Sequence, residues 1–239
     1  MLRILSIGNS FSVDAHTFVP QLFEAGGAGE VLLGNLYIGG CSLERHWQNA
    51  REDAAAYDYS KTGCENRPAS IREALLEEKW DYVTMQQASH FSWRPETYEP
   101  YGGPLVATIR ELAPQAKIVV QETWSYPPWD KRLEKFGFDQ AEMYSRLHAA
   151  YASFAGRYGF EVIPVGTAAE FVPDRNSLFT KPDFHFNREG VYLQGLAFTA
   201  KLFGVDVRKC PYRPSWMVAD RAEAIKASVR DAVEGRTGR

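Results

Sequence analysis

The chain has 239 residues, of which 45% are hydrophobic, and 27 basic against 30 acidic residues give it a net charge of −3 at pH 7. A chain of this length and composition can bury a sizeable core, which favours one large α/β domain over two small ones. The charges form no long basic run, so the sequence predicts neither a nucleic-acid partner nor binding to an anionic membrane surface.

The sequence shows no segment typical of membrane insertion or export. No apolar run approaches the roughly 20 residues that span a bilayer, and the first predicted strand begins without the regions of a signal peptide. Cys41, Cys64 and Cys210 are widely spaced and odd in number, which fits neither a disulfide framework nor a CxxC metal site. We therefore expect reduced thiols in a cytoplasmic protein.

Five short apolar segments, each followed by a helical pattern, make up most of the chain. The segments are typical of buried strands and span 4–7, 31–38, 80–85, 117–121 and 161–165. The predicted helices span 17–25, 42–47, 70–79, 104–112, 139 to 156 or 159, 187–203 and 216–233, with capping boxes at Ser70 and Asp139. This alternation predicts a parallel sheet covered on both faces, with residues 51–68 as an irregular excursion.

Polar residues follow four of the predicted strands. They are Gly8-Asn9-Ser10, Gly39-Gly40-Cys41-Ser42, Gln86-Gln87 and Glu122. Because the carboxyl ends of parallel strands meet at one edge of a sheet, we expect these residues to converge there. The alternative is that Asn9 and Ser10 serve only as turn and helix-cap residues.

Asp183 and His185, far along the chain, are separated by one residue. In an extended segment the side chains of residues i and i+2 face the same way, so Asp183 can orient His185. A serine hydroxyl needs a base to take its proton as it attacks, and we assign Ser10 as nucleophile and His185 as base. Asp183 would hold the imidazole tautomer and stabilise the imidazolium ion.

The oxyanion that forms during such an attack needs hydrogen-bond donors already in place. The candidate donors are the backbone N–H groups of Ser10 and Gly40, together with a side-chain amide from Gln86 or Gln87. Four motifs therefore form one candidate catalytic set. They are Gly-Asn-Ser after the first strand, the glycine loop after the second, the glutamines after the third, and the Asp-x-His motif late in the chain.

This order of motifs resembles the SGNH (GDSL-like) hydrolase superfamily, and more closely a branch of bacterial carbohydrate esterases with an Ile-Gly-Asn-Ser-Phe start. The similarity runs from residue 2 to about residue 204. It implies Ser10 as nucleophile, Gly40 and Gln86 as oxyanion donors, with Gln87 as the alternative to Gln86, and His185 as base.

Three positions depart from the superfamily pattern. Asn9 stands where many members have aspartate, and the third block lacks its usual asparagine at Gln86-Gln87. One residue, instead of two, separates Asp183 from His185, so Asp174 or a main-chain carbonyl remains an alternative orienting group.

The resemblance implies a flavodoxin-like three-layer α/β/α fold with a central, mostly parallel five-stranded sheet. It also implies no metal and no cofactor, and hydrolysis through an acyl-enzyme. We expect an SGNH domain over residues 1–204 and a helical extension over 205–239, packed on the same domain or on a neighbouring subunit.

The predicted function is a serine esterase that removes small acyl groups, acetyl above all, from carbohydrates. His46, His90, Trp93 and Trp124 are candidate substrate-binding residues, because aromatic faces beside the site suit a sugar ring. A structural role for His46, and loop packing for the aromatic residues, are the alternatives.

Other functions stay open at this point. A lipase or thioesterase would use the same residues, and a carbohydrate-binding relative without catalysis would explain the departures in the third and last blocks. A nucleotide-binding protein is disfavoured, because the turn after the first strand has neither a GxGxxG nor a GxxxxGK[ST] pattern.

Overall fold

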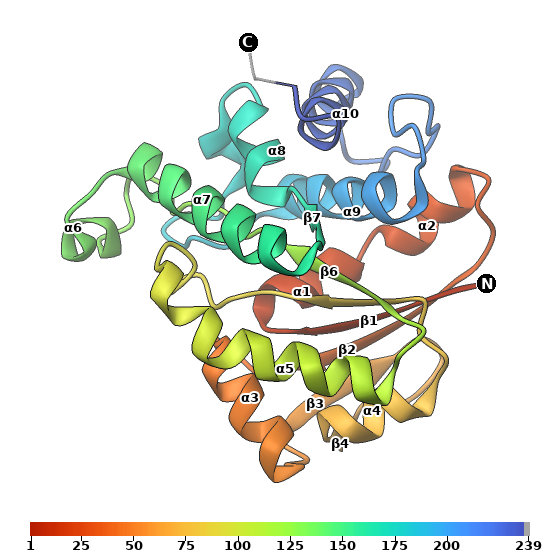
Figure 1. Cartoon of the computed structure of the whole chain (residues 1–239). Coiled ribbons are helices and arrows are strands. Elements are labelled where there is room, and N and C mark those ends of the chain that lie inside the picture. Colours follow the sequence, from red (N-terminus) through yellow and green to blue (C-terminus); the bar gives the residue numbers. More distant parts are fainter. Residues whose placement is uncertain (237–239) are drawn as a thin grey trace. The chain divides into compact units, whose positions relative to one another are not determined.

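The computed structural model describes residues 1–236, and these contain a seven-stranded sheet in the order β4-β3-β2-β1-β5-β6-β7 (Figure 1). The strands are β1 (Leu2–Gly8), β2 (Val31–Tyr37), β3 (Tyr57–Lys61), β4 (Arg67–Ala69), β5 (Tyr82–Met85), β6 (Lys117–Gln121) and β7 (Glu161–Ile163). Strand β1 pairs in parallel with β2 and β5, and β5 pairs in parallel with β6. The predicted α/β class with a central sheet is confirmed, and the sheet has seven strands instead of five.

Helices separate the strands along the chain. They are α1 (Ser10–His16), α2 (Val19–Ala25), α3 (Leu43–Glu52), α4 (Ile71–Glu77), α5 (Glu99–Leu112), α6 (Arg132–Phe136), α7 (Gln140–Tyr158), α8 (Val165–Phe171), α9 (Arg188–Phe203) and α10 (Ala219–Val233), with 3₁₀ turns η1 (Pro95–Thr97) and η2 (Arg175–Leu178). None of the helices in the described part of the chain is both long and apolar enough to cross a bilayer.

The chain forms two compact units. The first, here called the sheet unit, comprises residues 1–13, 31–121 and 149–162, and the second, here called the helical unit, comprises 14–30, 122–148 and the chain from 163 onward. In the helical unit, α9 contacts α2, α8 and α10, and α10 also contacts α8. The tail helix α10 thus packs on helices of its own chain, whereas the division at residue 204 stays a prediction.

In the sheet unit, α3, α4 and α5 pack against one another, and α4 contacts β1 and β2 (Figure 1). Strand β1 is the centre of this unit, because Ile4, Leu5 and Ile7 are almost fully buried. Burial of both faces of a strand is typical of a parallel sheet and explains the continuous apolar run in the sequence.

The prediction of an irregular segment over 51–68 is wrong. Strands β3 and β4 form there and extend the sheet by antiparallel pairing, β3 with β2 and β4 with β3. Tyr57 and Tyr59 are buried while Asp58 is exposed, so the period-two pattern of a strand was present, but in a short and polar segment.

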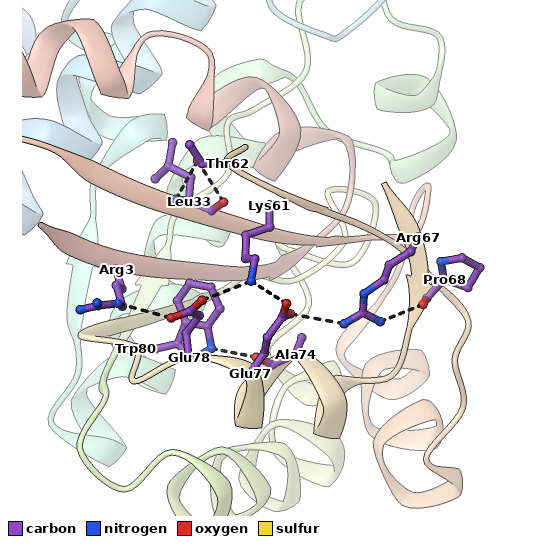
Figure 2. Close-up of polar contacts among 10 residues, drawn as sticks. All are labelled: Arg3, Leu33, Lys61, Thr62, Arg67, Pro68, Ala74, Glu77, Glu78 and Trp80. Atoms are coloured by element: carbon purple, nitrogen blue, oxygen red, sulfur yellow. Dashed lines mark hydrogen bonds and ion pairs between the residues drawn. The ribbon is translucent and has the colours of Figure 1, made fainter. Parts of the chain in front are cut away.

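Ion pairs tie this antiparallel addition to α4 (Figure 2). Lys61, on β3, contacts the carboxylates of Glu77 and Glu78 at 2.5 and 3.2 Å, and Arg67, on β4, contacts Glu77 at 3.3 Å. The Lys61 side chain is only 11% exposed, so these contacts are better shielded from solvent than ordinary surface ion pairs.

Several predicted helix boundaries are confirmed by their caps. Ser70 and Glu73 form the predicted capping box, with reciprocal hydrogen bonds of 2.7 and 3.2 Å. The Asn187 side chain accepts a hydrogen bond from the Glu189 N–H at 2.9 Å and caps α9. Helix α5, predicted to start at Pro104, begins five residues earlier, at Glu99, and Pro104 lies within it.

Candidate active site

The segment that carries the predicted nucleophile is a tight turn from β1 into α1. The Ser12 backbone N–H and hydroxyl both donate to the Asn9 carbonyl, at 3.0 and 2.8 Å. A Cβ on Gly8 would lie 2.7 Å from the Ser12 side chain, so glycine is required by this close approach. Ser10 is half-buried and is the first residue of α1.

The Asn9 side chain is the centre of a buried hydrogen-bond network. Its Nδ2 donates to the Cys41 carbonyl at 3.2 Å, and its Oδ1 accepts from the Phe11 N–H at 3.2 Å and from Gln86 Nε2 at 2.6 Å. An amide both donates and accepts, whereas an ionised aspartate would place a negative oxygen against the Cys41 carbonyl. This explains asparagine at position 9 and links the ends of β1 and β5 to the loop after β2.

Gly40 lies in that loop with φ of +62°, a conformation that favours glycine. The loop is held on both sides, because the Ile38 N–H donates to the Gly8 carbonyl at 3.3 Å and the Cys41 N–H donates to the Ile38 carbonyl at 3.2 Å. Ser42 then caps α3. The predicted oxyanion loop is therefore fixed to the end of β1, within the sheet unit.

The two glutamines after β5 have different roles. Gln87 Oε1 accepts from the Leu43 and Ala88 N–H groups at 3.0 and 2.9 Å, and its Nε2 donates to the carbonyl and hydroxyl oxygens of Thr97 at 3.0 and 3.1 Å. The Gln87 side chain is thus bonded within the fold through both its oxygen and its nitrogen. The amide of Gln86 donates to Asn9 with one N–H and keeps a second, so this geometry favours Gln86 as the side-chain donor.

The predicted base lies in the helical unit, in the segment before α9. His185 Nδ1 is 2.9 Å from Asp183 Oδ2, and the other carboxylate oxygen accepts from the Phe184 N–H at 2.6 Å. Burial tends to raise the pKa of Asp183, but these hydrogen bonds prevail and lower it, so the carboxylate stays ionised. A single residue between Asp183 and His185 therefore allows the carboxylate to contact the imidazole. Asp183, and not the alternative Asp174, makes this contact.

Aromatic contacts clamp the backbone on both sides of His185. Trp124 donates its indole N–H to the Phe184 carbonyl at 2.9 Å and stacks on Phe186 with ring centroids 3.7 Å apart. Tyr126 contacts Phe184 with centroids 4.7 Å apart. Because Phe184 and Phe186 flank His185, these contacts hold the backbone that carries the imidazole.

Two charged residues beside this segment were missed by the sequence analysis. Asp14, on α1, has a pKa raised by burial and partly lowered again by the charge of His185. The Arg132 guanidinium lies 3.9 Å from the Phe184 ring centroid and pairs with Asp130, its Nε 2.8 Å from Oδ1. Nothing in the sequence spacing marks either residue, apart from Asp14 lying four positions after Ser10.

The predicted substrate-binding residues divide into two groups. His46 is fully buried, its Nδ1 lies 2.8 Å from the Tyr57 hydroxyl, and burial lowers its pKa to about 3. Trp124 is also fully buried. Burial leaves neither ring a face for a ligand, which favours the structural alternative for both. His90 and Trp93 are half-buried in the loop after β5 and keep exposed surface.

No cluster of three or more His, Cys, Asp or Glu side chains in residues 1–236 has the arrangement of a metal site. The three cysteines are unpaired with one another, and burial raises the pKa of the Cys41 thiol to about 12, so this thiol is not a nucleophile at neutral pH.

Comparison with known proteins gives a family and several similar structures. Residues 3–232 match the family model described as Domain of unknown function (DUF4886). The crystal structure of a DUF4886 protein from Bacteroides uniformis ATCC 8492 is 31% identical, with 99% of this chain and 97% of that chain covered and a TM-score of 0.91. No curated protein matches the sequence.

Two further structures carry SGNH-type descriptions. One, a candidate SGNH hydrolase from Slackia heliotrinireducens, is 26% identical, with a TM-score of 0.61 over 84% of this chain and 98% of that one. The other, a lipase/acylhydrolase from Enterococcus faecalis, is 17% identical, with a TM-score of 0.59 over 85% of this chain and 96% of that one, a similarity of fold alone. The predicted similarity to SGNH hydrolase folds is confirmed, and the chain belongs to the DUF4886 family.

Proposed function

We propose that this protein is a serine esterase that hydrolyses small acyl esters of carbohydrates, acetyl esters foremost, in the cytoplasm. The observation that carries the proposal is the Asp183–His185 hydrogen bond of 2.9 Å, clamped by Trp124. With Nδ1–H directed at the carboxylate, His185 takes the tautomer whose Nε2 can accept a proton, as a general base requires.

In the proposed reaction, Ser10 Oγ attacks the ester carbonyl while its proton passes to His185 Nε2. The oxyanion accepts hydrogen bonds from the Ser10 and Gly40 N–H groups and from Gln86. His185 then protonates the leaving alcohol, and an acyl-enzyme forms on Ser10. Water, deprotonated by His185, hydrolyses this acyl-enzyme and regenerates the serine.

The network around Asn9 supports this assignment of donors. A preorganised donor stabilises a developing charge without reorganisation at the moment of reaction, and loss of one donor lowers kcat by about 10²–10³-fold. We therefore expect Gln86→Leu to lower kcat by about this factor. Gln87→Leu, which removes contacts within the fold, is the matched control.

The test is hydrolysis of 4-nitrophenyl acetate by the wild type, Ser10→Ala, His185→Ala and the double variant. Each single variant is expected to lose at least about 10²-fold in kcat/KM. The double variant should lose little more than either single one, because two residues that act in one step are not additive. Ser228→Ala, on α10, is the control for a serine outside the site.

Two results would contradict the proposal. Full activity of Ser10→Ala would exclude this serine as nucleophile. A wild type inert on every ester, yet able to bind sugars by calorimetry, would favour a carbohydrate-binding relative without catalysis. A series of nitrophenyl esters of increasing chain length separates an acetylesterase from a lipase or thioesterase, which would prefer the longer acyl groups.

A further inference from the structure

A polar hollow of about 530 Å³ lies in the helical unit, and no step of the proposed reaction uses it. Its walls come from η2, the start of α9 and the start of α10. The lining residues are Asp174, Ser177, Asn187, Arg188, Glu189 and Arg221. The volume falls within the range of about 300–1,000 Å³ that small-molecule sites occupy. Asn187, one of the lining residues, follows the predicted base His185 by two positions in the sequence.

The walls of this hollow are held in place by their own hydrogen bonds. Arg221 Nε lies 2.9 Å from Glu189 Oε2, and its other nitrogens donate to the Pro173 carbonyl at 2.8 Å and to Ser177 Oγ at 2.5 Å. Asn187 Nδ2 donates to the Ser177 carbonyl at 2.6 Å. The hollow is therefore preformed, which reduces the entropy lost when a ligand binds.

The chemistry of the lining narrows the class of ligand. All six side chains end in a polar or charged group, so the hollow suits a ligand that forms hydrogen bonds better than a bare acyl chain. Two carboxylates balance two guanidinium groups, so there is no excess charge to attract an ion. Carboxylate acceptors that alternate with guanidinium, amide and hydroxyl groups match the neighbouring donors and acceptors of a neutral polyol.

Two of the lining residues are available to a ligand. Arg188 is exposed and lies with its guanidinium 4.3 Å from the Trp216 ring centroid, which orients the group without an acidic partner. Asp174 is exposed, forms no ion pair within residues 1–236, and has φ of +53°, a conformation in which non-glycine residues are uncommon. Such conformations concentrate at ligand sites.

We propose that this hollow binds the sugar part of the substrate, a neutral and hydroxylated ring. This inference rests on the proposed esterase function and adds the position at which the carbohydrate is recognised. Asp174 supplies an acceptor, and Arg188 supplies donors, for hydroxyl groups of the ring.

The first experiment measures binding directly. Xylose, glucose and N-acetylglucosamine are titrated into the wild type, Asp174→Asn and Arg188→Met, with decanoate and inorganic phosphate as ligands of different chemistry. Asparagine also tolerates the left-handed conformation at position 174, so this variant keeps the backbone. Arg208→Met, at an exposed arginine outside the hollow, is the matched control.

We expect at least one sugar to bind, and its affinity to fall about tenfold in each hollow variant but not in Arg208→Met, as loss of a charged hydrogen bond predicts. Sugar binding that is equal in all variants, or no sugar binding at all, would overturn the inference. Preference for phosphate or decanoate would do the same. Unfolding temperatures of the variants show that the fold is intact.

The second experiment separates this inference from the proposed function. The ratio of kcat/KM for an acetylated xylose to kcat/KM for 4-nitrophenyl acetate should fall about tenfold in the hollow variants, since only the first substrate carries a sugar. If the variants are active esterases and this ratio is unchanged, sugar binding in the hollow is refuted but the esterase function is not. An enzyme inert on both esters whose sugar binding depends on Asp174 and Arg188 refutes the esterase but not the site.

Discussion

Trp124 provides the sharpest test of how the base is positioned. Trp124→Phe keeps an aromatic ring against Phe186 but removes the indole N–H that holds the Phe184 carbonyl at 2.9 Å. A carbonyl left without its donor destabilises the fold by about 1–3 kcal/mol. In a chain of this length, each kcal/mol lowers Tm by roughly 2–4 °C.

The effect on catalysis should exceed what this loss of stability explains. A shift of about 1 Å in a catalytic group can lower a rate about 10²-fold, so we expect kcat for 4-nitrophenyl acetate to fall by about tenfold or more with little change in KM. In a His185→Ala background, Trp124→Phe should lower kcat no further, because the base whose position it affects is already absent.

Trp80→Phe is the matched control. Trp80 is also fully buried and donates its indole N–H to the Ala74 carbonyl at 2.8 Å (Figure 2), but it belongs to the sheet unit and not to the unit that holds His185. We expect a similar loss of Tm and an unchanged kcat. Equal kcat for the wild type and Trp124→Phe, with Tm lowered as in Trp80→Phe, would show that Trp124 has only a structural role.

Three further predictions concern stability. Gln87→Leu should lower Tm by roughly 5–10 °C in thermal unfolding, because several buried hydrogen bonds are lost together, and an unchanged Tm would contradict the network. Lys61→Met should lower Tm at pH 7 but not at pH 3. Burial raises the pKa of Glu77, but Lys61, Tyr59 and Arg67 together lower it below its ordinary value, so the stabilisation by Lys61 disappears as the pH falls through the lowered pKa. His148→Gln should show the opposite pH dependence, because the hydrogen bond with Glu122 raises the pKa of His148. The loss of Tm relative to the wild type should be larger at pH 5.5, where His148 is protonated, than at pH 9. A loss of Tm that does not change with pH would refute this pairing.

Strands and caps could be predicted because their signals are local. The run of Ile4, Leu5 and Ile7 indicates a buried strand without any knowledge of its neighbours, and the capping box at Ser70 depends on residues three positions apart. Strands β3 and β4 were missed because their stability comes from partners outside the segment. Lys61 needs Glu77, sixteen residues later, before a polar strand becomes favourable.

The same distinction applies to the candidate site. Asp183 and His185 are near in sequence, and their contact followed from strand geometry. The role of Trp124 did not, because its partner Phe184 is sixty residues away and an aromatic residue in a loop is equally compatible with stacking on a sugar. Pattern identifies residue types suited to a function, whereas burial decides whether they face a ligand or the core.

The departures from the superfamily pattern are consistent with one another in this structure. Glutamine has one more methylene than asparagine, so Gln86 extends far enough from β5 to donate to Asn9 Oδ1 at 2.6 Å. An aspartate at position 9 could accept that bond but could not donate to the Cys41 carbonyl, which Asn9 Nδ2 contacts at 3.2 Å. Asparagine at the first block and glutamine at the third therefore belong together, as two halves of one network that fixes the Gly40 loop.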